Sequence, residues 1–202
     1  MIILGITGGT GCGKTTALDA IAALGGASLD CDALYHDLLQ TSRALQQALQ
    51  ERFPAAYPDG IFDRKKLGSI VFTDPVALED LNQITGEHIL RAVRQWLARQ
   101  IEANRPLVAI DAIRLLESDI AKLCKRTIAV LAPTEDRVRR LMAREGISEA
   151  YARLRIAAQP SNEEFAAQCD FILMNDCASA ADFAIRCRAC FEKILKEESS
   201  NE

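Results

Sequence analysis

Short apolar runs along the chain alternate with longer segments in which apolar residues recur every three or four positions. Five runs have the length and the β-branched content of buried parallel strands, at residues 2–7, 27–32, 106–111, 127–131 and 170–174. Helical spacing is found at residues 14–24, 134–145, 148–158 and 179–196. Because strands that alternate with helices favour right-handed crossovers, the pattern predicts an α/β fold. We expect a five-stranded parallel sheet flanked by helices.

The pattern changes between residues 33 and 105, where long helical segments replace the alternation. Two helices are expected there, at residues 33–53 and 76–103, with a turn-rich link at residues 54–60. We therefore expect a core formed by residues 1–32 and 106–202. Residues 33–105 are expected to form a helical insertion into that core.

The segment after the first strand matches the phosphate-binding pattern G-x-x-x-x-G-K-[ST] without a gap, as Gly8-Gly9-Thr10-Gly11-Cys12-Gly13-Lys14-Thr15. Glycines allow successive backbone N–H groups to point at phosphate oxygens, and the following helix contributes its positive end. Lys14 can reach the β- and γ-phosphates, and the Thr15 hydroxyl can bind Mg²⁺. The position between a strand and a helix supports a P-loop NTPase core that binds ATP. The expected nucleotide contacts are Gly9, Thr10, Gly11, Cys12, Gly13, Lys14, Thr15 and Thr16.

Acidic residues follow two of the other predicted strands. Asp111 ends the apolar run 107–110, as does the acid associated with magnesium in P-loop proteins, although many buried strands also end in Asp. We expect Thr15 and Asp111 at the metal. Asp30 and Asp32 follow the second strand, on the same side of an extended chain. Asp32 is expected to orient an acceptor hydroxyl and take its proton, with capping of a helix that starts at Ala33 as the alternative.

Arginines cluster in the predicted helix at residues 134–145 and just after it. Arg140 and Arg144 are one turn apart on one face, and we expect them to stabilise charge on the transferred phosphate. For Arg137 and Arg139 we expect a solvated face paired with nearby glutamates.

Composition excludes several other classes of protein. The formal net charge of −4 argues against a bulk nucleic-acid binder, and no apolar run reaches the length of a membrane span. The first seven residues are too short for a signal peptide, so we expect a cytoplasmic protein, as a monomer or weak homo-oligomer. The seven cysteines are scattered, which does not fit a disulfide framework. Cys187 and Cys190 are interpreted as buried thiols in a helix rather than as a metal or redox site.

Several segments taken together resemble the dephospho-coenzyme A kinase family. The resemblance begins with MIILGITGGTGCGKTTALDAIAALGG and LDCDALYHDLL, and it continues with DAIRLLE at residues 111–117. The segment from Arg140 to Arg144, the region of Gln159 and DFILMN at residues 170–175 then follow in the family's order. The resemblance covers nearly the whole chain.

The resemblance implies transfer of the ATP γ-phosphate to the 3′-hydroxyl of the ribose of dephospho-CoA, the last step of coenzyme A biosynthesis. By position, Asp32 would be the carboxylate at that hydroxyl, with Thr7 and Glu117 on the acceptor side. Lys14 and Arg140 would act on the phosphate, and Asn175 would lie near the adenine. The insertion 33–105 would bind the acceptor, and residues from about 144 to 168 would form a mobile lid.

Three departures from the family pattern leave the loop and Asp32 unchanged, and two of them fall in or beside the expected acceptor site. Gly86-Glu87 replace a His-Pro pair, Ile113 replaces the Pro of a Pro-Leu-Leu segment and is followed by Arg114, and Cys177 replaces a glycine. A nucleoside or nucleotide kinase shares the same core and is the first alternative. An ATP-binding regulatory protein without an acceptor is the second, whereas a GTPase is disfavoured because the sequence has no N-K-x-D motif.

Overall fold

The computed structural model describes residues 1–199 of the chain and divides it into two compact units. The first unit contains residues 1–30 together with the chain from residue 98 onward, and the second contains residues 31–97. Among the described residues, none of the helices combines the length and the apolar character needed to cross a bilayer.

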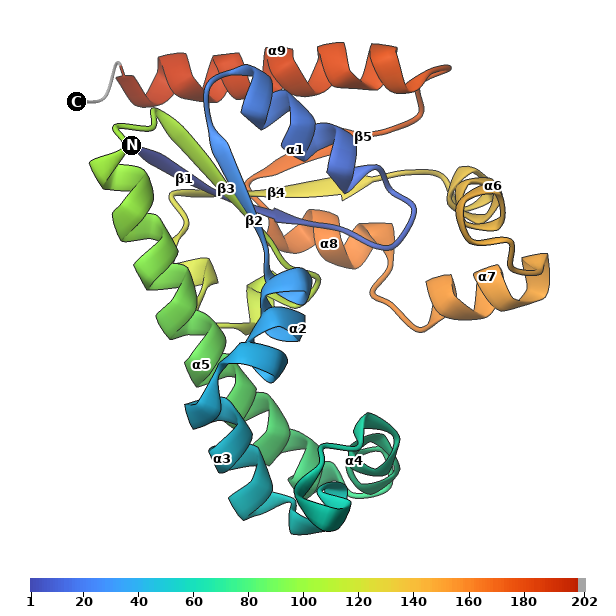
Figure 1. Ribbon diagram of the computed structural model, residues 1–202. Helices are drawn as coiled ribbons and strands as arrows, with labels where there is room; N and C mark the ends of the chain where they lie inside the picture. The colour runs from blue at the N-terminus through green and yellow to red at the C-terminus, as the bar shows by residue number, and fades with distance from the viewer. Residues whose placement is uncertain (200–202) are drawn as a thin grey trace. The chain divides into compact units, whose positions relative to one another are not determined.

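The first unit is built on a parallel sheet of five strands (Figure 1). The strands are β1 (Ile2–Thr7), β2 (Ala27–Asp30), β3 (Leu107–Asp111), β4 (Arg126–Leu131) and β5 (Phe171–Met174), and their order in the sheet is β2-β3-β1-β4-β5. All four pairings are parallel. The predicted five-stranded parallel sheet is thus confirmed, and β1 lies at its centre.

Helices cover both faces of this sheet because its strands carry apolar side chains alternately on each side. On β4, Ile128 and Val130 join the main core with α1 (Lys14–Ala23) and α9 (Ala180–Ser199). Ala129 and Leu131 point the other way and pack with α8 (Asn162–Gln168) (Figure 1). The central strand β1 is likewise buried, from Leu4 to Thr7, so the loop that follows it starts from the interior of the first unit.

Helices α6 (Thr134–Glu145) and α7 (Glu149–Ala157) form a pair with a small apolar core of their own. Helix α6 ends at Gly146, whose φ of 67° lies in the left-handed region that glycine adopts without strain. The Ser148 hydroxyl caps α7 by accepting a hydrogen bond from the Tyr151 N–H. The bounds predicted for α6 agree with the structure, and those of α7 agree to within one residue.

The second unit consists of helices around an apolar cluster that includes Leu45, Leu49 and Phe53. Its elements are α2 (Cys31–Thr41), α3 (Arg43–Arg52), α4 (Arg64–Val71) and the part of α5 (Pro75–Glu102) up to Leu97, with short 3₁₀ turns at Pro54–Ala56 and Pro58–Gly60. Two further 3₁₀ turns, Leu115–Glu117 and Ala121–Leu123, lie in the first unit. The prediction of one helix over residues 33–53 is wrong, because Ser42 interrupts it and caps α3 through the Leu45 N–H. Helix α4 was not predicted from the sequence.

The start of α2 corrects a second expectation. Strand β2 ends at Asp30 and α2 already begins at Cys31, so Asp32 lies in the first turn of a helix. Asp30 and Asp32 therefore do not share one side of an extended chain, and that prediction is wrong. Asp32 is also not the N-cap of a helix starting at Ala33.

Candidate functional site

The phosphate-binding loop leaves β1 at Gly8 and enters α1 at Lys14. Gly8 has a φ of 140°, and a Cβ atom there would lie 2.1 Å from the Val130 carbonyl oxygen. Gly13 has a φ of 102°, and a Cβ atom there would lie 2.4 Å from Nδ2 of Asn175. Both positions require glycine, since a side chain would be strained and would clash. The first glycine lets the loop pass against β4, and the second lets Asn175 approach the start of α1.

Lys14 folds back over this loop. Its Nζ donates a hydrogen bond of 3.0 Å to the Gly8 carbonyl oxygen, so the charge lies above the peptides that the motif provides for phosphate. The α1 N-cap, Gly13, has no side chain with which to cap the helix. No N-cap side chain therefore accepts hydrogen bonds from the first backbone N–H groups of α1. These N–H groups can instead bind an anion such as phosphate.

Cys12 anchors the loop to the main core. Its side chain is fully buried in the main core, and its N–H donates to the Gly9 carbonyl oxygen at 3.3 Å. Burial raises the pKa of the Cys12 thiol, while the charges of Arg137 and Lys14 act in the opposite direction. Cys12 therefore contributes backbone to the loop and an apolar side chain to the core.

Arg140 and Asn175, both predicted at the nucleotide, lie against the loop. The Arg140 guanidinium donates to the Gly11 carbonyl oxygen at 3.1 Å and to the Asn175 carbonyl oxygen at 3.4 Å. The buried side chain of Asn175 donates through Nδ2 to the Cys12 carbonyl oxygen at 2.8 Å. Helix α6 and the end of β5 are thus tied to successive residues of the loop.

Arg137 was expected on a solvated face, and that expectation is wrong. Its side chain is only 3% exposed. Its Nε donates to the Thr10 carbonyl oxygen at 2.9 Å, and its Nη2 donates to Oε1 of Gln159 at 3.1 Å. A signal was present in the sequence, because Arg137 precedes Arg140 by three residues and so shares its face of the helix.

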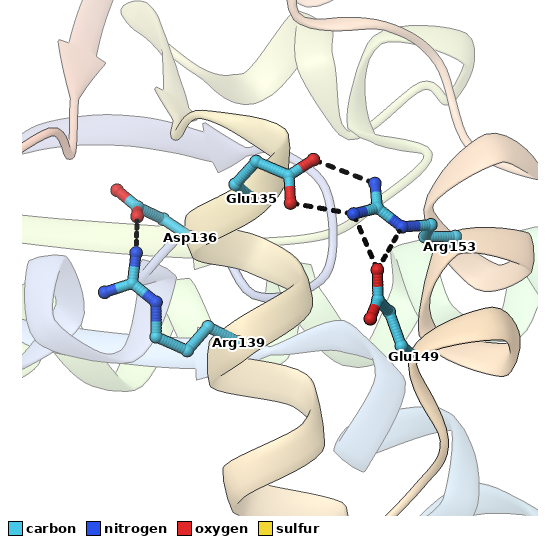
Figure 2. A network of polar contacts seen from close by, with 5 residues as sticks. All are labelled: Glu135, Asp136, Arg139, Glu149 and Arg153. Carbon is cyan, nitrogen blue, oxygen red and sulfur yellow. Dashed lines mark hydrogen bonds and ion pairs between the residues drawn. The ribbon is translucent and has the colours of Figure 1, made fainter.

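The other arginines of α6 and α7 form exposed ion pairs. Figure 2 shows Arg139 beside Asp136 and Arg153 bridging two glutamates. Arg153 contacts Glu135 at 2.7 Å and Glu149 at 2.8 Å, which joins α6 to α7. The solvated face predicted for Arg139 is confirmed. Such exposed pairs contribute little to stability.

Arg144 lies near the end of α6, where it is exposed and pairs with Glu145. Glu145 also pairs with Arg155, and the hydrogen bonds from both arginines lower the pKa of its carboxyl. The contact of Arg144 is therefore with an acid of its own helix rather than with the loop. Its role at phosphate stays a prediction.

The residues predicted for the metal come from two neighbouring elements. Asp111 is the last residue of β3, is 8% exposed and lies in register with Ile6 of β1 and Asp30 of β2. Thr15 is exposed in the first turn of α1. Within residues 1–199 no group of three or more His, Cys, Asp or Glu side chains could hold a metal ion. A carboxylate and a hydroxyl suit Mg²⁺ that takes its other ligands from nucleotide phosphates and water.

The residues predicted on the acceptor side come from three different elements: Thr7 ends β1, Asp32 lies in α2, and Glu117 lies in the 3₁₀ turn after β3. Thr7 is fully buried, and its hydroxyl donates to the Ile113 carbonyl oxygen at 3.2 Å. Glu117 is exposed and forms a 2.7 Å ion pair with Arg114, one of the departures from the family pattern. Asp32 is exposed in the first turn of α2, two residues beyond the end of β2.

All seven cysteines are free thiols. Cys187 is buried in the main core, and burial raises the pKa of its thiol to about 12. Its neighbour Cys190 is partly buried against the same core. These side chains pack as apolar groups, as the sequence analysis expected for this pair.

Comparison with known proteins gives a consistent result. A family model described as dephospho-CoA kinase matches residues 2–181. The dephospho-CoA kinase of Anaeromyxobacter dehalogenans is 35% identical over 177 residues, which is 87% of this chain and 84% of that protein. The dephospho-CoA kinase of Lactobacillus acidophilus is 31% identical over 177 residues, which is 86% of this chain and 88% of that protein.

Solved structures show the same fold. A crystal structure from Thermus thermophilus superposes with a TM-score of 0.79 at 32% identity, covering 97% of both chains. A shikimate kinase from Bacteroides thetaiotaomicron has a TM-score of 0.54 at 15% identity, covering 96% of this chain and 98% of that one. The second likeness concerns the fold alone, which is that of the P-loop kinases.

Proposed function

Because this chain belongs to the dephospho-CoA kinase family, we propose that it transfers the γ-phosphate of ATP to the 3′-hydroxyl of the ribose of dephospho-CoA. The products are coenzyme A and ADP, so the reaction is the last step of coenzyme A biosynthesis. The observation that carries this proposal is the phosphate-binding loop with Lys14 folded over it, in a chain that matches the family model over residues 2–181.

Phosphoryl transfer requires charge stabilisation and alignment more than covalent participation of the protein. When ATP binds, Lys14 exchanges the Gly8 carbonyl oxygen for phosphate oxygens, and the amides of the loop and of the first turn of α1 hold the same group. Arg140 is already fixed by two carbonyl oxygens beside the loop, which supports a role in stabilising the transferred phosphate. Arg144 would have to leave Glu145 to join it.

The acceptor hydroxyl needs a carboxylate that orients it and takes its proton as the new bond to phosphorus forms. We assign this role to Asp32, supported by its place just after β2, whose last residue pairs with Asp111. Thr7 and Glu117 are assigned to the acceptor side. The Thr7 hydroxyl is held by the loop after β3, and it would fix the end of β1 next to the acceptor.

Thr15 and Asp111 are the proposed protein ligands of Mg²⁺, directly or through water. When bound, Mg²⁺ would neutralise phosphate charge and favour departure of ADP. Thr16 and Asn175 are assigned to ATP, with Asn175 on the adenine side.

The larger assignments follow from the two units. We propose that the helical insertion, predicted at residues 33–105 and compact over residues 31–97, binds dephospho-CoA. Residues from about 144 to 168, which include α7 and α8, are proposed as the lid. We further propose a cytoplasmic protein that is a monomer or a weak homo-oligomer, which sedimentation at several concentrations would check.

The test is ADP release from ATP and Mg²⁺ with dephospho-CoA, beside parallel reactions with AMP, adenosine, phosphopantetheine or no acceptor. Turnover with dephospho-CoA alone is expected. Turnover only with a nucleoside or a nucleotide would overturn the acceptor but keep the phosphoryl transfer. Binding of ATP without turnover on any acceptor would support the regulatory alternative instead.

A further inference from the structure

Arg137 is a buried charge whose partners are neutral. It is 3% exposed, and its two hydrogen bonds go to the carbonyl oxygen of Thr10 and to the side-chain amide of Gln159. Within residues 1–199 it forms no ion pair, whereas Arg139 and Arg153 on the same pair of helices bind carboxylates (Figure 2). A buried guanidinium without a counter-charge is unfavourable, so this arrangement needs a reason.

The acids that share a cavity with Arg137 do not supply that charge. Glu163 and Glu164 line a cavity of about 520 Å³ that Arg137 and Gln159 also line. Glu164 instead accepts the Ser161 N–H at 2.7 Å and completes the capping box of α8. In the described part of the chain, neither glutamate forms an ion pair with Arg137.

The guanidinium lies directly against the phosphate-binding loop. A Cβ atom on Gly9 would lie 2.1 Å from Nη2 of Arg137, so the second glycine of the motif leaves the space that Arg137 uses. A Cβ atom on Gly11 would lie 3.0 Å from the Arg137 carbonyl oxygen, so the backbone of α6 approaches the loop as well. The charge of Arg137 also acts on the thiol of Cys12 inside the loop, as that of Lys14 does.

Three hydrogen bonds close a ring around the peptides of Thr10. The Thr10 carbonyl oxygen accepts from Arg137, and the Thr10 N–H donates to Oε1 of Gln159 at 2.8 Å. The same Oε1 accepts from Arg137, so both polar backbone groups of Thr10 are fixed. Thr10 lies at the middle of the loop, and Gln159 lies just beyond α7, in the segment proposed as the lid.

We propose that Arg137 and Gln159 are positioning residues for ATP, which hold the loop through Thr10 while the phosphates of ATP supply the charge that Arg137 lacks. Arg137 acts through the Thr10 peptide and through its charge, and Gln159 links the proposed lid to the same peptide. The proposal rests on ATP as the ligand of the loop. It adds to the proposed function a reason for a buried cation that has no ion pair within residues 1–199.

The test compares Arg137→Met, Arg137→Lys and the wild-type protein by nucleotide binding and by kinetics. For Arg137→Met we expect the Kd and KM of ATP to rise about 10- to 100-fold, because a hydrogen-bonded charge at a phosphate site is lost. The KM of dephospho-CoA should change less than about twofold, because the acceptor side is untouched. Arg137→Lys keeps the positive charge but lacks the planar set of N–H donors of the guanidinium. Its Kd and KM for ATP should lie between those of the wild type and of Arg137→Met.

Melting temperatures separate this role from a structural one. Without nucleotide, Arg137→Met should melt no lower than about 3 °C below the wild type, because a buried unpaired charge is removed with its bonds. The rise in melting temperature that ATP causes in the wild type should be markedly smaller in Arg137→Met. The rise caused by AMP, which carries a single phosphate, should be reduced less. Arg139→Met, which loses an exposed ion pair on the same helix, should match the wild type in every measurement.

Two results would overturn the proposal. One is a folded Arg137→Met protein with unchanged Kd and KM for ATP. The other is a large loss of stability without nucleotide, with equal weakening of both substrates. If the wild type bound ATP but phosphorylated no acceptor, the proposed function would fail, while the binding comparison would still decide the role of Arg137.

Discussion

At the scale of single residues, the Lys14 ammonium is bound to the loop itself when no ATP is present. Lys14 Nζ rests on the Gly8 carbonyl oxygen at 3.0 Å, a partner that it can release without backbone movement. A neutral carbonyl binds a cation less strongly than a phosphate does, so ATP displaces the internal partner. The affinity of the loop for phosphate therefore depends on a hydrogen bond that is easily exchanged.

Lys14→Ala tests this role. Turnover should fall at least about 100-fold, because one preorganised cation at the transferred phosphate is lost. The circular dichroism spectrum should be unchanged, since the side chain makes one internal hydrogen bond. Lys122→Ala, which removes an exposed pair with Asp119, serves as the control. Normal turnover in Lys14→Ala would contradict the mechanism.

Asp32→Asn tests the proposed base. The amide keeps the size of the side chain but cannot take a proton, so kcat should fall about 100-fold or more, with the KM of ATP changed less than about twofold. Asp37→Asn, exposed on the same helix α2, is the matched control. A rise in KM with intact kcat would count against a role in proton transfer.

The residue scale is also where sequence reasoning failed most clearly. The motif alone predicted the loop, because its chemistry is local and its spacing is strict. Arg137 and Arg139 look alike in sequence, yet one is buried and the other exposed. Whether an arginine is buried depends on which other elements pack over its helix. The sequence pattern of that one helix does not contain this information.

At the scale of elements, boundaries followed from local signals where such signals exist. Helix α6 was predicted from its apolar spacing with its observed bounds, and Gly146 ends it in the structure. The break at Ser42 escaped notice because apolar spacing continues through it. Helix α8 was also missed, although Ser161 and Glu164 have the spacing of the capping box that the structure contains.

Hydrogen bonds between Asp170 and Thr127 join the start of strand β5 to β4. The Asp170 carboxylate accepts from the Thr127 N–H at 2.7 Å and from the Thr127 hydroxyl at 2.8 Å. Burial alone would raise the pKa of Asp170, but these hydrogen bonds outweigh it and lower the pKa below its usual value. A carboxyl with a lowered pKa stabilises the fold above its unfolded pKa of about 3.9, and this contribution is lost as the pH falls through the folded pKa.

Asp170→Asn should therefore lower the free energy of unfolding at pH 7 by about 1 kcal/mol, a value reduced for the solvent exposure of this carboxylate. The difference from the wild type should shrink below about pH 4. Urea titrations at pH 7, 5 and 3 measure it. Asp119→Asn, which breaks an exposed pair with Lys122, should change stability by less than about 0.5 kcal/mol. A difference that is constant over this pH range would refute the charge-based explanation.

At the scale of the whole molecule, the two compact units contribute differently to the proposed reaction. The loop with all its anchors belongs to the first unit, and so do Thr7 and Glu117, which are proposed on the acceptor side. Residues 31–97 have their own apolar cluster, and we propose that they supply further contacts to the acceptor.

Hydrogen exchange with each ligand tests this division. ATP should protect the loop at residues 8–16 together with the start of α6 and the region of Gln159. Dephospho-CoA should protect amides within residues 31–97. Coenzyme A serves as the product control and should give the second pattern. Protection of residues 31–97 by ATP alone would contradict the assignment of the acceptor to this unit.

The space that Gly9 leaves for Arg137 also constrains how this protein could have evolved. A Cβ atom at position 9 would meet the Arg137 guanidinium at 2.1 Å, so an alanine there would displace the end of that side chain from its present place. The hydrogen bonds from Arg137 to Thr10 and Gln159 depend on that place. The dependence is one-way, because glycine at position 9 leaves room for any residue at position 137, whereas a lineage that keeps Arg137 in this place loses these contacts when the second glycine of the loop changes.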